Sequence, residues 1–326
     1  MSEWSRELRV ATEAVRAAAR VCRAVQERLV TADTLEKKDK SPVTVADFAS
    51  QAIVCAHLEA ALPRDPIVGE EDAHELRDDA NAAIRAAVIE RVAAEQSGAE
   101  PARVLDWIDR GGAPAGGGRM WTLDPIDGTK GFLRGEQYAI ALALLVDGEV
   151  ELGVLGCPNL PHEGHPGALF VARRGAGAQV GPLWDAAGSF RSIATARLAS
   201  PAAARFCESV ESGHSDQDES AEVARLLGIT ATPCRMDSQC KYGAVARDDA
   251  QIYLRLPTRA DYEEKIWDHA AGKLVVEAAG GTVTDVEGRP LDFTRGRTLA
   301  GNKGVIATCG GIHEAVLGAV ARARAS

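Results

Sequence analysis

Two apolar runs joined by Asp147-Gly148 constrain the fold of this chain more than any other local pattern. Residues 139–146 and 150–155 each have the length of a strand, and an Asp-Gly pair between two such runs favours a tight hairpin turn. Shorter apolar runs over 120–123 and 168–171 predict further strands nearby. The middle of the chain is therefore predicted to form a sheet with at least one antiparallel pair.

Helical patterns flank these strands. Apolar residues recur in steps of three and four from Leu8 to Leu29, which predicts a long N-terminal helix with one face on the core. Residues 46–62, stopped by Pro63, and residues 80–96 predict two more helices. The C-terminal part predicts helices over 221–227 and 265–279, strands over 252–254, 282–285 and 304–308, and a terminal helix. The chain is thus expected to be an α+β protein whose sheets are covered by helices.

A glycine-rich segment, Gly175–Gly188, marks the expected boundary between two subdomains, 1–180 and 181–326. A chain of 326 residues is long enough for two units, at roughly 100–200 residues each.

Composition excludes several classes of protein. The formal net charge of −10 argues against a nucleic-acid-coating protein, because phosphate neutralisation needs clustered Lys and Arg. The apolar runs are far shorter than the ~20 residues of a membrane span, and the N-terminus lacks the pattern of a signal peptide. Seven scattered cysteines without a C-x-x-C pair predict buried, reduced thiols in a cytoplasmic protein. His162 and His165 lack partners that would complete a zinc site.

Carboxylates stand beside backbone-shaping residues at four places in the chain. These segments are Ser41-Pro-Val-Thr-Val-Ala-Asp47, Gly69-Glu-Glu-Asp72, Asp124-Pro-Ile-Asp-Gly-Thr129 and Trp267-Asp-His-Ala-Ala-Gly272.

The segment 124–129 is the most informative of the four. Asp124 and Asp127, three residues apart with a backbone carbonyl between them, suit a hard cation such as Mg²⁺. Gly128 allows a tight turn, and Thr129 follows where a helix is expected to begin. Taken alone, the same motif is equally typical of a turn with capping aspartates.

The other three segments favour the metal site. Asp47 is expected at the head of a helix, Glu70 and Glu71 follow a short apolar strand, and Asp268 is expected to open a helix. Strand ends and helix starts are where α/β sheets gather ligands. Such a cluster of unpaired carboxylates would repel itself, so metal ions are its natural partner.

Together, the acidic pair, the D-P-I-D-G-T motif and the later W-D motif resemble the Mg²⁺-dependent, lithium-sensitive phosphatase superfamily of inositol monophosphatase and fructose-1,6-bisphosphatase. Longer stretches resemble its 3′(2′),5′-bisphosphate nucleotidase branch, which converts adenosine 3′,5′-bisphosphate to AMP and phosphate. These stretches are 121–137, 236–242, 252–257 and 265–272. The resemblance runs from Ser41 to about Cys309 and implies alternating layers of helices and sheets in two subdomains.

The resemblance also implies roles for individual residues. Two or three Mg²⁺ would be held by Glu70, Asp124, Asp127, Asp268 and the carbonyl of Ile126. Glu70 is chosen over Glu71 because the first acid of the pair is the usual ligand in the family. Asp47 and Thr129 would orient and deprotonate the attacking water. Thr129, His214, Ser238, Lys241, Arg255 and Asp268 would bind the nucleotide substrate.

Three alternatives remain open from the sequence. An inositol polyphosphate 1-phosphatase or a general sugar phosphatase would use the same metal site, and a non-catalytic phosphonucleotide sensor would keep the fold. The feature that separates nucleotides from the other substrates is the group of His214, Ser238, Lys241 and Arg255. Singly, these residues are typical of a loop histidine, an exposed helical lysine and a strand-edge arginine. The sequence does not distinguish adenosine 3′,5′-bisphosphate from its sulfated form, 3′-phosphoadenylyl sulfate.

Overall fold

The structure is a computed structural model that describes residues 4–29, 45–210, 217–257, 259 and 262–325. The helices are α1 Ser5–Leu29, α2 Val45–Ala61, α3 Ala82–Glu95, α4 Pro101–Asp109, α5 Thr129–Arg134, α6 Gln217–Leu227, α7 Cys240–Ala246, α8 Ala270–Ala278 and α9 His313–Ala323. The strands are β1 Ile67–Gly69, β2 Arg119–Asp127, β3 Ala139–Val146, β4 Glu149–Cys157, β5 Ala168–Arg173, β6 Gly177–Pro182, β7 Arg191–Ile193, β8 Phe206–Glu208, β9 Cys234–Arg235, β10 Ile252–Arg255, β11 Thr282–Thr284 and β12 Val305–Thr308.

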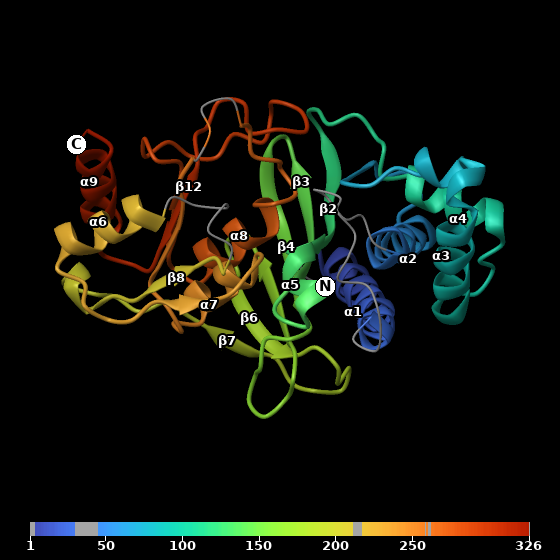
Figure 1. Ribbon diagram of the computed structural model, residues 1–326, viewed down its shortest axis with the longest axis horizontal. Coiled ribbons are helices and arrows are strands. Elements are labelled where there is room, and N and C mark those ends of the chain that lie inside the picture. The colour runs from blue at the N-terminus through green and yellow to red at the C-terminus, as the bar shows by residue number, and fades with distance from the viewer. Residues whose placement is uncertain (1–3, 30–44, 211–216, 258, 260–261, 326) are drawn as a thin grey trace.

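These elements form alternating layers, as Figure 1 shows. Helices α1 and α2 cover one face of a seven-stranded sheet, and α7 and α8 cover its other face. Beyond α7 and α8 lies a five-stranded sheet, whose outer face packs on α6 and α9. The expected α+β class with alternating layers is therefore confirmed.

The first sheet follows the order of the chain, from β1 to β7. Strand β1 pairs parallel with β2, and the remaining neighbours pair antiparallel. The predicted hairpin is β3–β4, with Asp147 and Gly148 at φ values of 50° and 84° in its turn. Both values are positive, as a two-residue type I′ turn requires, which explains why an Asp-Gly pair stands here.

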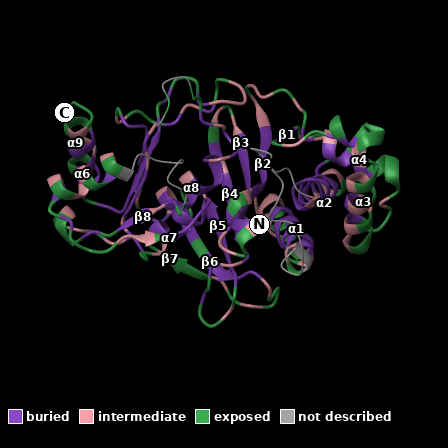
Figure 2. Ribbon diagram, in the orientation of Figure 1, coloured by how far each residue is buried: buried purple, intermediate pink, exposed green. Residues whose placement is uncertain are grey.

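Strand β3 shows how the sequence sets the spacing of the layers. Its larger side chains, Ile140, Leu142 and Leu144, belong to the core shared with α1 and α2. The alternate residues are mostly alanines and face α8, so this helix can approach the sheet closely (Figure 2). A Cβ at Gly153 of β4 would lie 2.8 Å from the backbone oxygen of Ala271. Small residues on both partners therefore fix the depth at which α8 lies.

The expected subdomain boundary at 180/181 falls inside β6, which pairs with β5 and β7. The glycine-rich segment 175–188 thus contributes a strand to the first sheet. The chain changes sheets between Ile193 and Phe206. The division into subdomains 1–180 and 181–326 stays a prediction.

Several predicted boundaries were wrong. The helix expected over 265–279 begins only at Ala270, because residues 265–269 form turns in which Asp268 N–H donates to the Lys265 carbonyl at 3.2 Å. The helix expected from residue 80 begins at Ala82, after a short 3₁₀ turn. Helix α4 was not predicted, although Pro101 at its first turn is a known start signal.

The seven cysteines are free thiols, and all except half-buried Cys234 are buried, as expected. His162 and His165 exchange backbone hydrogen bonds of 2.9 and 2.8 Å and close a tight turn. Among the described residues, no helix is long and apolar enough to cross a membrane.

Gly272 of α8 gives a test of how closely this helix packs on its neighbours. A Cβ there would lie 2.2 Å from the ring of buried Tyr242, whereas a Cβ at Gly318 of α9 would meet nothing within 4 Å. We expect Gly272→Ala to lower the free energy of unfolding by about 1–3 kcal/mol through overpacking. Gly318→Ala, the matched control, should raise it by roughly 0.5–1 kcal/mol. Denaturant unfolding measures both, and equal effects would contradict the close approach at Gly272.

Candidate active site

The two aspartates of the D-P-I-D-G-T motif lie on one side of β2 because the strand carries a bulge. Asp124 pairs with Ala141 of β3, and Asp127 pairs with Ala139, so β2 has one more residue than β3 over this interval. Side chains three residues apart in a regular strand would point to opposite faces. The extra residue turns Asp127 to the side of Asp124. Gly128 follows at φ 89° and Thr129 begins α5, as predicted.

The acidic pair joins these aspartates through the parallel pairing of β1 and β2. Glu70 follows β1 directly, and its N–H donates to the carbonyl of Leu123 at 3.2 Å. The carboxyl ends of parallel strands meet at the same edge of a sheet, which brings Glu70 beside Asp124. Buried Gln51 of α2 holds the pair, because its side-chain oxygen accepts from Glu71 N–H at 3.1 Å.

Asp47 lies in the first turn of α2, as expected, and is buried. The same helix is tied to the motif by Ser50, whose hydroxyl donates to the carbonyl of Pro125 at 2.8 Å. The Asp47 carboxylate helps to raise the pKa values of Glu70, Glu71 and Asp124. It therefore stands behind the acidic cluster.

The electrostatics of the cluster fit a site for cations. Burial, reinforced by neighbouring carboxylates, raises the pKa of Glu70 to about 9 and that of Glu71 to about 8. The same causes raise the pKa of Asp124 well above its ordinary value. Burial also raises the pKa values of Asp127 and Asp268, against an opposing effect of Arg255. Asp124 Oδ1 is buried and accepts no hydrogen bond from any described residue. An orphaned carboxylate oxygen among other carboxylates is what a bound cation would satisfy.

A cavity of about 380 Å³ opens over this cluster. The predicted site residues that line it are Glu70, Asp124, Ile126, Asp127, Thr129, Ser238, Lys241, Arg255 and Asp268. Asp47 does not line the cavity, and His214 lies outside the described residues. The charged residues of the lining fall into two groups that adjoin one another, because Arg255 contacts Asp268. We call Glu70, Asp124, Asp127 and Asp268 the acidic end of the lining, and Lys241 of α7 and Arg255 of β10 the cationic end.

Lys241 is a buried residue of α7, so the alternative of an exposed helical lysine was wrong. Its ammonium donates to the carbonyl of Met236 at 3.4 Å and lies 5.1 Å from the ring centroid of Tyr253. Burial lowers the pKa of Lys241, while the nearby Asp127 carboxylate opposes that change. Ser238, at φ 68°, precedes α7 and packs on Gly128, where a Cβ would lie 2.9 Å from that of Ser238.

Arg255 ends β10 and lies at the meeting point of both ends of the cavity. Its guanidinium pairs with Glu264 at 2.8 Å and contacts Asp268 Oδ2 at 3.4 Å. Glu264, Asp268 and His269 lie close enough together to hold a metal ion, but Glu264 is paired with Arg255 and contacts His269. We therefore assign Glu264 to binding the arginine, whereas Asp268 also belongs to the acidic cluster beside Glu70.

Several residues of the cavity were not predicted from the sequence. They are Ser209, Asp237, Gln239, Tyr253 and Tyr262, with Glu264 behind Arg255. Gln239 fixes two site elements at once, because its N–H donates to Asp127 and its side-chain amide donates to the Trp267 carbonyl at 2.9 Å. Asp237, Gln239 and Tyr253 lie in the stretches 236–242 and 252–257 that carry the family resemblance, which could have pointed to them, whereas Ser209, Tyr262 and Glu264 lie outside these stretches.

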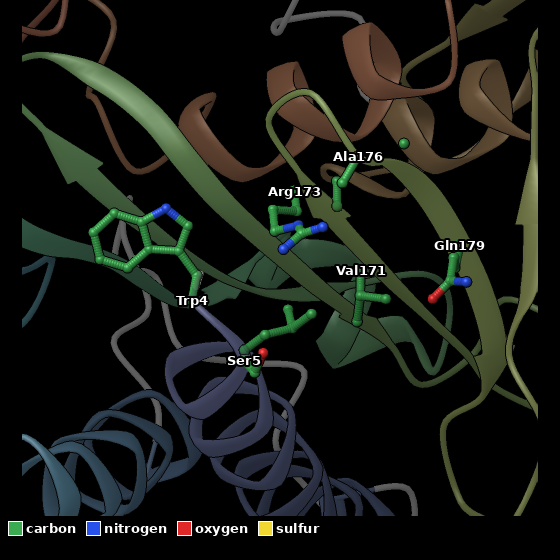
Figure 3. A pocket seen from close by; sticks show the side chains of 9 residues that line it. Trp4, Ser5, Val171, Arg173, Ala176 and Gln179 are labelled. Carbon is green, nitrogen blue, oxygen red and sulfur yellow. The ribbon is translucent and has the colours of Figure 1, made fainter. Parts of the chain in front are cut away.

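A second pocket, of about 240 Å³, lies between the start of α1 and the β5–β6 hairpin. Figure 3 shows Trp4, Arg173 and Gln179 around it. It contains none of the predicted site residues.

Solved structures with this fold include inositol monophosphatases. The Thermotoga maritima IMPase aligns with a TM-score of 0.65 at 21% identity, covering 98% of each chain. The inositol monophosphatase of Anabaena aligns with a TM-score of 0.61 at 20% identity, covering 97% of this chain and 95% of that one. This chain therefore has the inositol monophosphatase fold.

The sequence gives the family directly. The model of the inositol monophosphatase family matches residues 3–323, and the chain belongs to this family, which is generally metal-dependent. It is 47% identical over 315 residues to the 3′(2′),5′-bisphosphate nucleotidase of Emericella nidulans, covering 88% of this chain and 90% of that protein. The 3′(2′),5′-bisphosphate nucleotidase of Schizosaccharomyces pombe is 45% identical over 334 residues, with 97% and 95% covered.

Proposed function

We propose that this chain removes the 3′-phosphate of adenosine 3′,5′-bisphosphate, giving AMP and inorganic phosphate, and also acts on 3′-phosphoadenylyl sulfate. The observation that carries the proposal is one cavity whose lining combines an acidic cluster with the cations Lys241 and Arg255. Relatives of 40–47% identity over most of the chain, named 3′(2′),5′-bisphosphate nucleotidases, support the same substrate class. A substrate with two phosphates can engage both ends of such a cavity. The seven free thiols fit a cytoplasmic enzyme.

The acidic end is the proposed metal centre. Glu70, Asp124, Asp127 and Asp268, with the carbonyl of Ile126, would hold two or three divalent cations, and an all-oxygen donor set favours Mg²⁺. When bound, the cations would neutralise the phosphate dianion and acidify a water molecule.

The chain's own residues would then position the reaction. Thr129 lines the cavity, and among the described residues its hydroxyl makes only a long contact of 3.4 Å with the Ile126 carbonyl, so it is available to orient the attacking water. Asp47, behind the cluster, would receive the proton of that water by way of Thr129 Oγ1. The water oxygen forms the new bond to phosphorus, the bond to the 3′-oxygen breaks, and the 3′-oxygen takes a proton from solvent.

The cationic end would bind the part of the substrate that does not react. Ser238, Lys241 and Arg255, with His214, would hold the nucleoside and its 5′-phosphate. Arginine can bind a phosphate through paired donors, and lysine adds a point charge.

A phosphate-release panel tests the proposed substrate class. Purified protein with Mg²⁺ should release phosphate from adenosine 3′,5′-bisphosphate and 3′-phosphoadenylyl sulfate much faster than from inositol 1,4-bisphosphate or fructose 1,6-bisphosphate. Faster release from the inositol or sugar compounds would favour an inositol polyphosphate 1-phosphatase or a general sugar phosphatase instead. Binding without any phosphate release would instead indicate a sensor.

Arg255→Ala tests the role of the cationic end. We expect kcat/KM for adenosine 3′,5′-bisphosphate to fall about 10- to 100-fold, the effect of losing charge-assisted hydrogen bonds. Adenosine 3′-monophosphate, which has no 5′-phosphate, should change by less than about 3-fold. Adding Lys241→Ala should further reduce the preference for adenosine 3′,5′-bisphosphate over adenosine 3′-monophosphate. Arg295→Ala, at an exposed arginine paired with Asp292, is the control. Equal losses on both substrates would show that Arg255 does not bind the 5′-phosphate.

A further inference from the structure

Arg255 is the member of the cationic end whose guanidinium makes paired contacts with a carboxylate. Its Nε lies 3.0 Å from Glu264 Oε1 and its Nη2 lies 2.8 Å from Glu264 Oε2. This paired contact uses two of the three guanidinium nitrogens and fixes the plane of the group. Glu264 is buried, so the pair is largely shielded from water.

A second pair of buried side chains holds Glu264 from behind. His269 Nε2 lies 3.2 Å from Glu264 Oε2, and His269 Nδ1 lies 2.7 Å from the hydroxyl of Tyr242. His269 is fully buried and Tyr242 is 1% exposed. Tyr242 is itself packed edge-on against Tyr253, with the ring centroids 5.1 Å apart. The carboxylate therefore cannot turn without breaking a chain of contacts through α7 and the turn before α8.

The orientation that results is useful for binding an anion. The contacts of the guanidinium with the described carboxylates use Nε and Nη2, and Nη2 also lies 3.5 Å from the hydroxyl of Tyr262. These contacts leave Nη1 for a ligand, and Arg255 lines the cavity beside Tyr253 and Tyr262. Nη2 also lies 3.4 Å from Asp268 Oδ2 at the acidic end. Without Glu264, the nearest remaining carboxylate for the guanidinium would be Asp268. The arginine would then be drawn away from its position at the cationic end.

We propose that Glu264 is a positioning residue for substrate specificity, which holds Arg255 so that its free edge meets the second, non-reacting phosphate of the substrate. Glu264 does not touch the substrate and acts through the arginine. The inference rests on the proposed function, in which that second phosphate is the 5′-phosphate of the nucleotide.

Glu264→Gln tests the proposal, because the amide keeps the shape of the side chain but loses its charge and one acceptor. We expect kcat/KM for adenosine 3′,5′-bisphosphate to fall about 10- to 100-fold, mainly through KM, as for other hydrogen bonds to charged groups. Activity on adenosine 3′-monophosphate should change by less than about 3-fold. Calorimetric titration with AMP, which carries only the 5′-phosphate, should show a weakened Kd of similar size. Glu277→Gln, at a carboxylate paired with Lys273 on α8, is the matched control.

A double-mutant cycle separates positioning from an independent effect. If Glu264 acts through Arg255, the double variant Arg255→Ala, Glu264→Gln should have a kcat/KM for adenosine 3′,5′-bisphosphate within about 3-fold of that of Arg255→Ala alone. If the two losses instead multiply, the proposal is overturned. Tyr242→Phe, which removes only the outer contact of the chain, should give a smaller loss with the same selectivity. This variant keeps the proposal testable if Glu264→Gln does not fold.

The outcomes distinguish this inference from the proposed function. Wild-type protein that neither hydrolyses adenosine 3′,5′-bisphosphate nor binds AMP would overturn the function and the inference with it. Wild-type protein that does both, together with a Glu264→Gln variant that loses equally on both substrates, would overturn the inference alone.

Discussion

Chelation of divalent cations is expected to abolish phosphate release from adenosine 3′,5′-bisphosphate, and Mg²⁺ is expected to restore it. The reason is the cluster of four carboxylates, Glu70, Asp124, Asp127 and Asp268, in which only Asp268 has an ion-pair partner among the described residues, Arg255 at 3.4 Å. A phosphate dianion would be repelled by this cluster unless bound cations reverse the local charge. Turnover that continues undiminished in chelator would contradict the proposed metal centre. Inhibition by Li⁺ is expected from the family resemblance.

The variant Asp124→Asn tests the proposed metal centre at a single residue. Loss of one buried carboxylate from the proposed metal centre should lower kcat/KM by at least about 10³-fold, since metal ions supply several kcal/mol of charge stabilisation in such reactions. The stability of the metal-free protein, in contrast, should stay the same or rise. The raised pKa of Asp124 means that its ionised form is less favourable in the folded protein than in the unfolded one, so at neutral pH the carboxylate destabilises the metal-free fold.

Melting temperatures test this opposition of activity and stability. In chelator, Asp124→Asn should melt at or above the temperature of the wild type. Mg²⁺ should raise the melting temperature of the wild type, because it binds the folded state, and should raise that of the variant much less. Asp79→Asn, at a fully exposed aspartate, is the control for the substitution itself. A variant that melts far below the wild type in chelator would assign Asp124 a structural role instead.

Local patterns predicted the parts of this fold in which neighbours in sequence are also neighbours in space. The hairpin over 139–157 is determined by two apolar runs and the Asp147-Gly148 turn, which are all adjacent in the chain. The acidic motifs at residues 70, 124 and 127 were found because each follows a recognisable apolar strand. The start of α8 was predicted at residue 265, which is too early. The apolar residues Ile266 and Trp267 continue the pattern of this helix, although their backbone forms turns.

Contacts between distant segments could not be predicted in this way. The β2 bulge is defined by the register of β2 against β3. The residues Pro125 and Ile126 are equally typical of the regular end of a strand, so the local sequence does not indicate a bulge. The pair between Arg255 and Glu264 joins a strand to a later loop, and no periodicity connects these positions. Lys241 of α7 is buried because Tyr253, from β10, covers it. In each case the missing information is the tertiary arrangement of the layers.

Thr129→Val is the second change with a large expected effect. The hydroxyl lies in the cavity at the first position of α5, and its contact with the Ile126 carbonyl, at 3.4 Å, is too long to contribute much to stability. Valine has nearly the same shape, so the melting temperature and the stabilisation by Mg²⁺ should change little. If the hydroxyl orients the attacking water, kcat should fall by on the order of 10²–10⁴.

Thr129→Ser is the matched control, because it removes the methyl group and keeps the hydroxyl. Its kcat should stay within about 10-fold of the wild type, well above that of Thr129→Val. Measuring kcat and KM for both variants with adenosine 3′,5′-bisphosphate separates the two roles that the position allows. A Val variant with wild-type kcat would leave Thr129 only as the residue that begins α5. Loss of kcat in the Val variant, with KM unchanged and the Ser variant active, would place the hydroxyl in the chemical step.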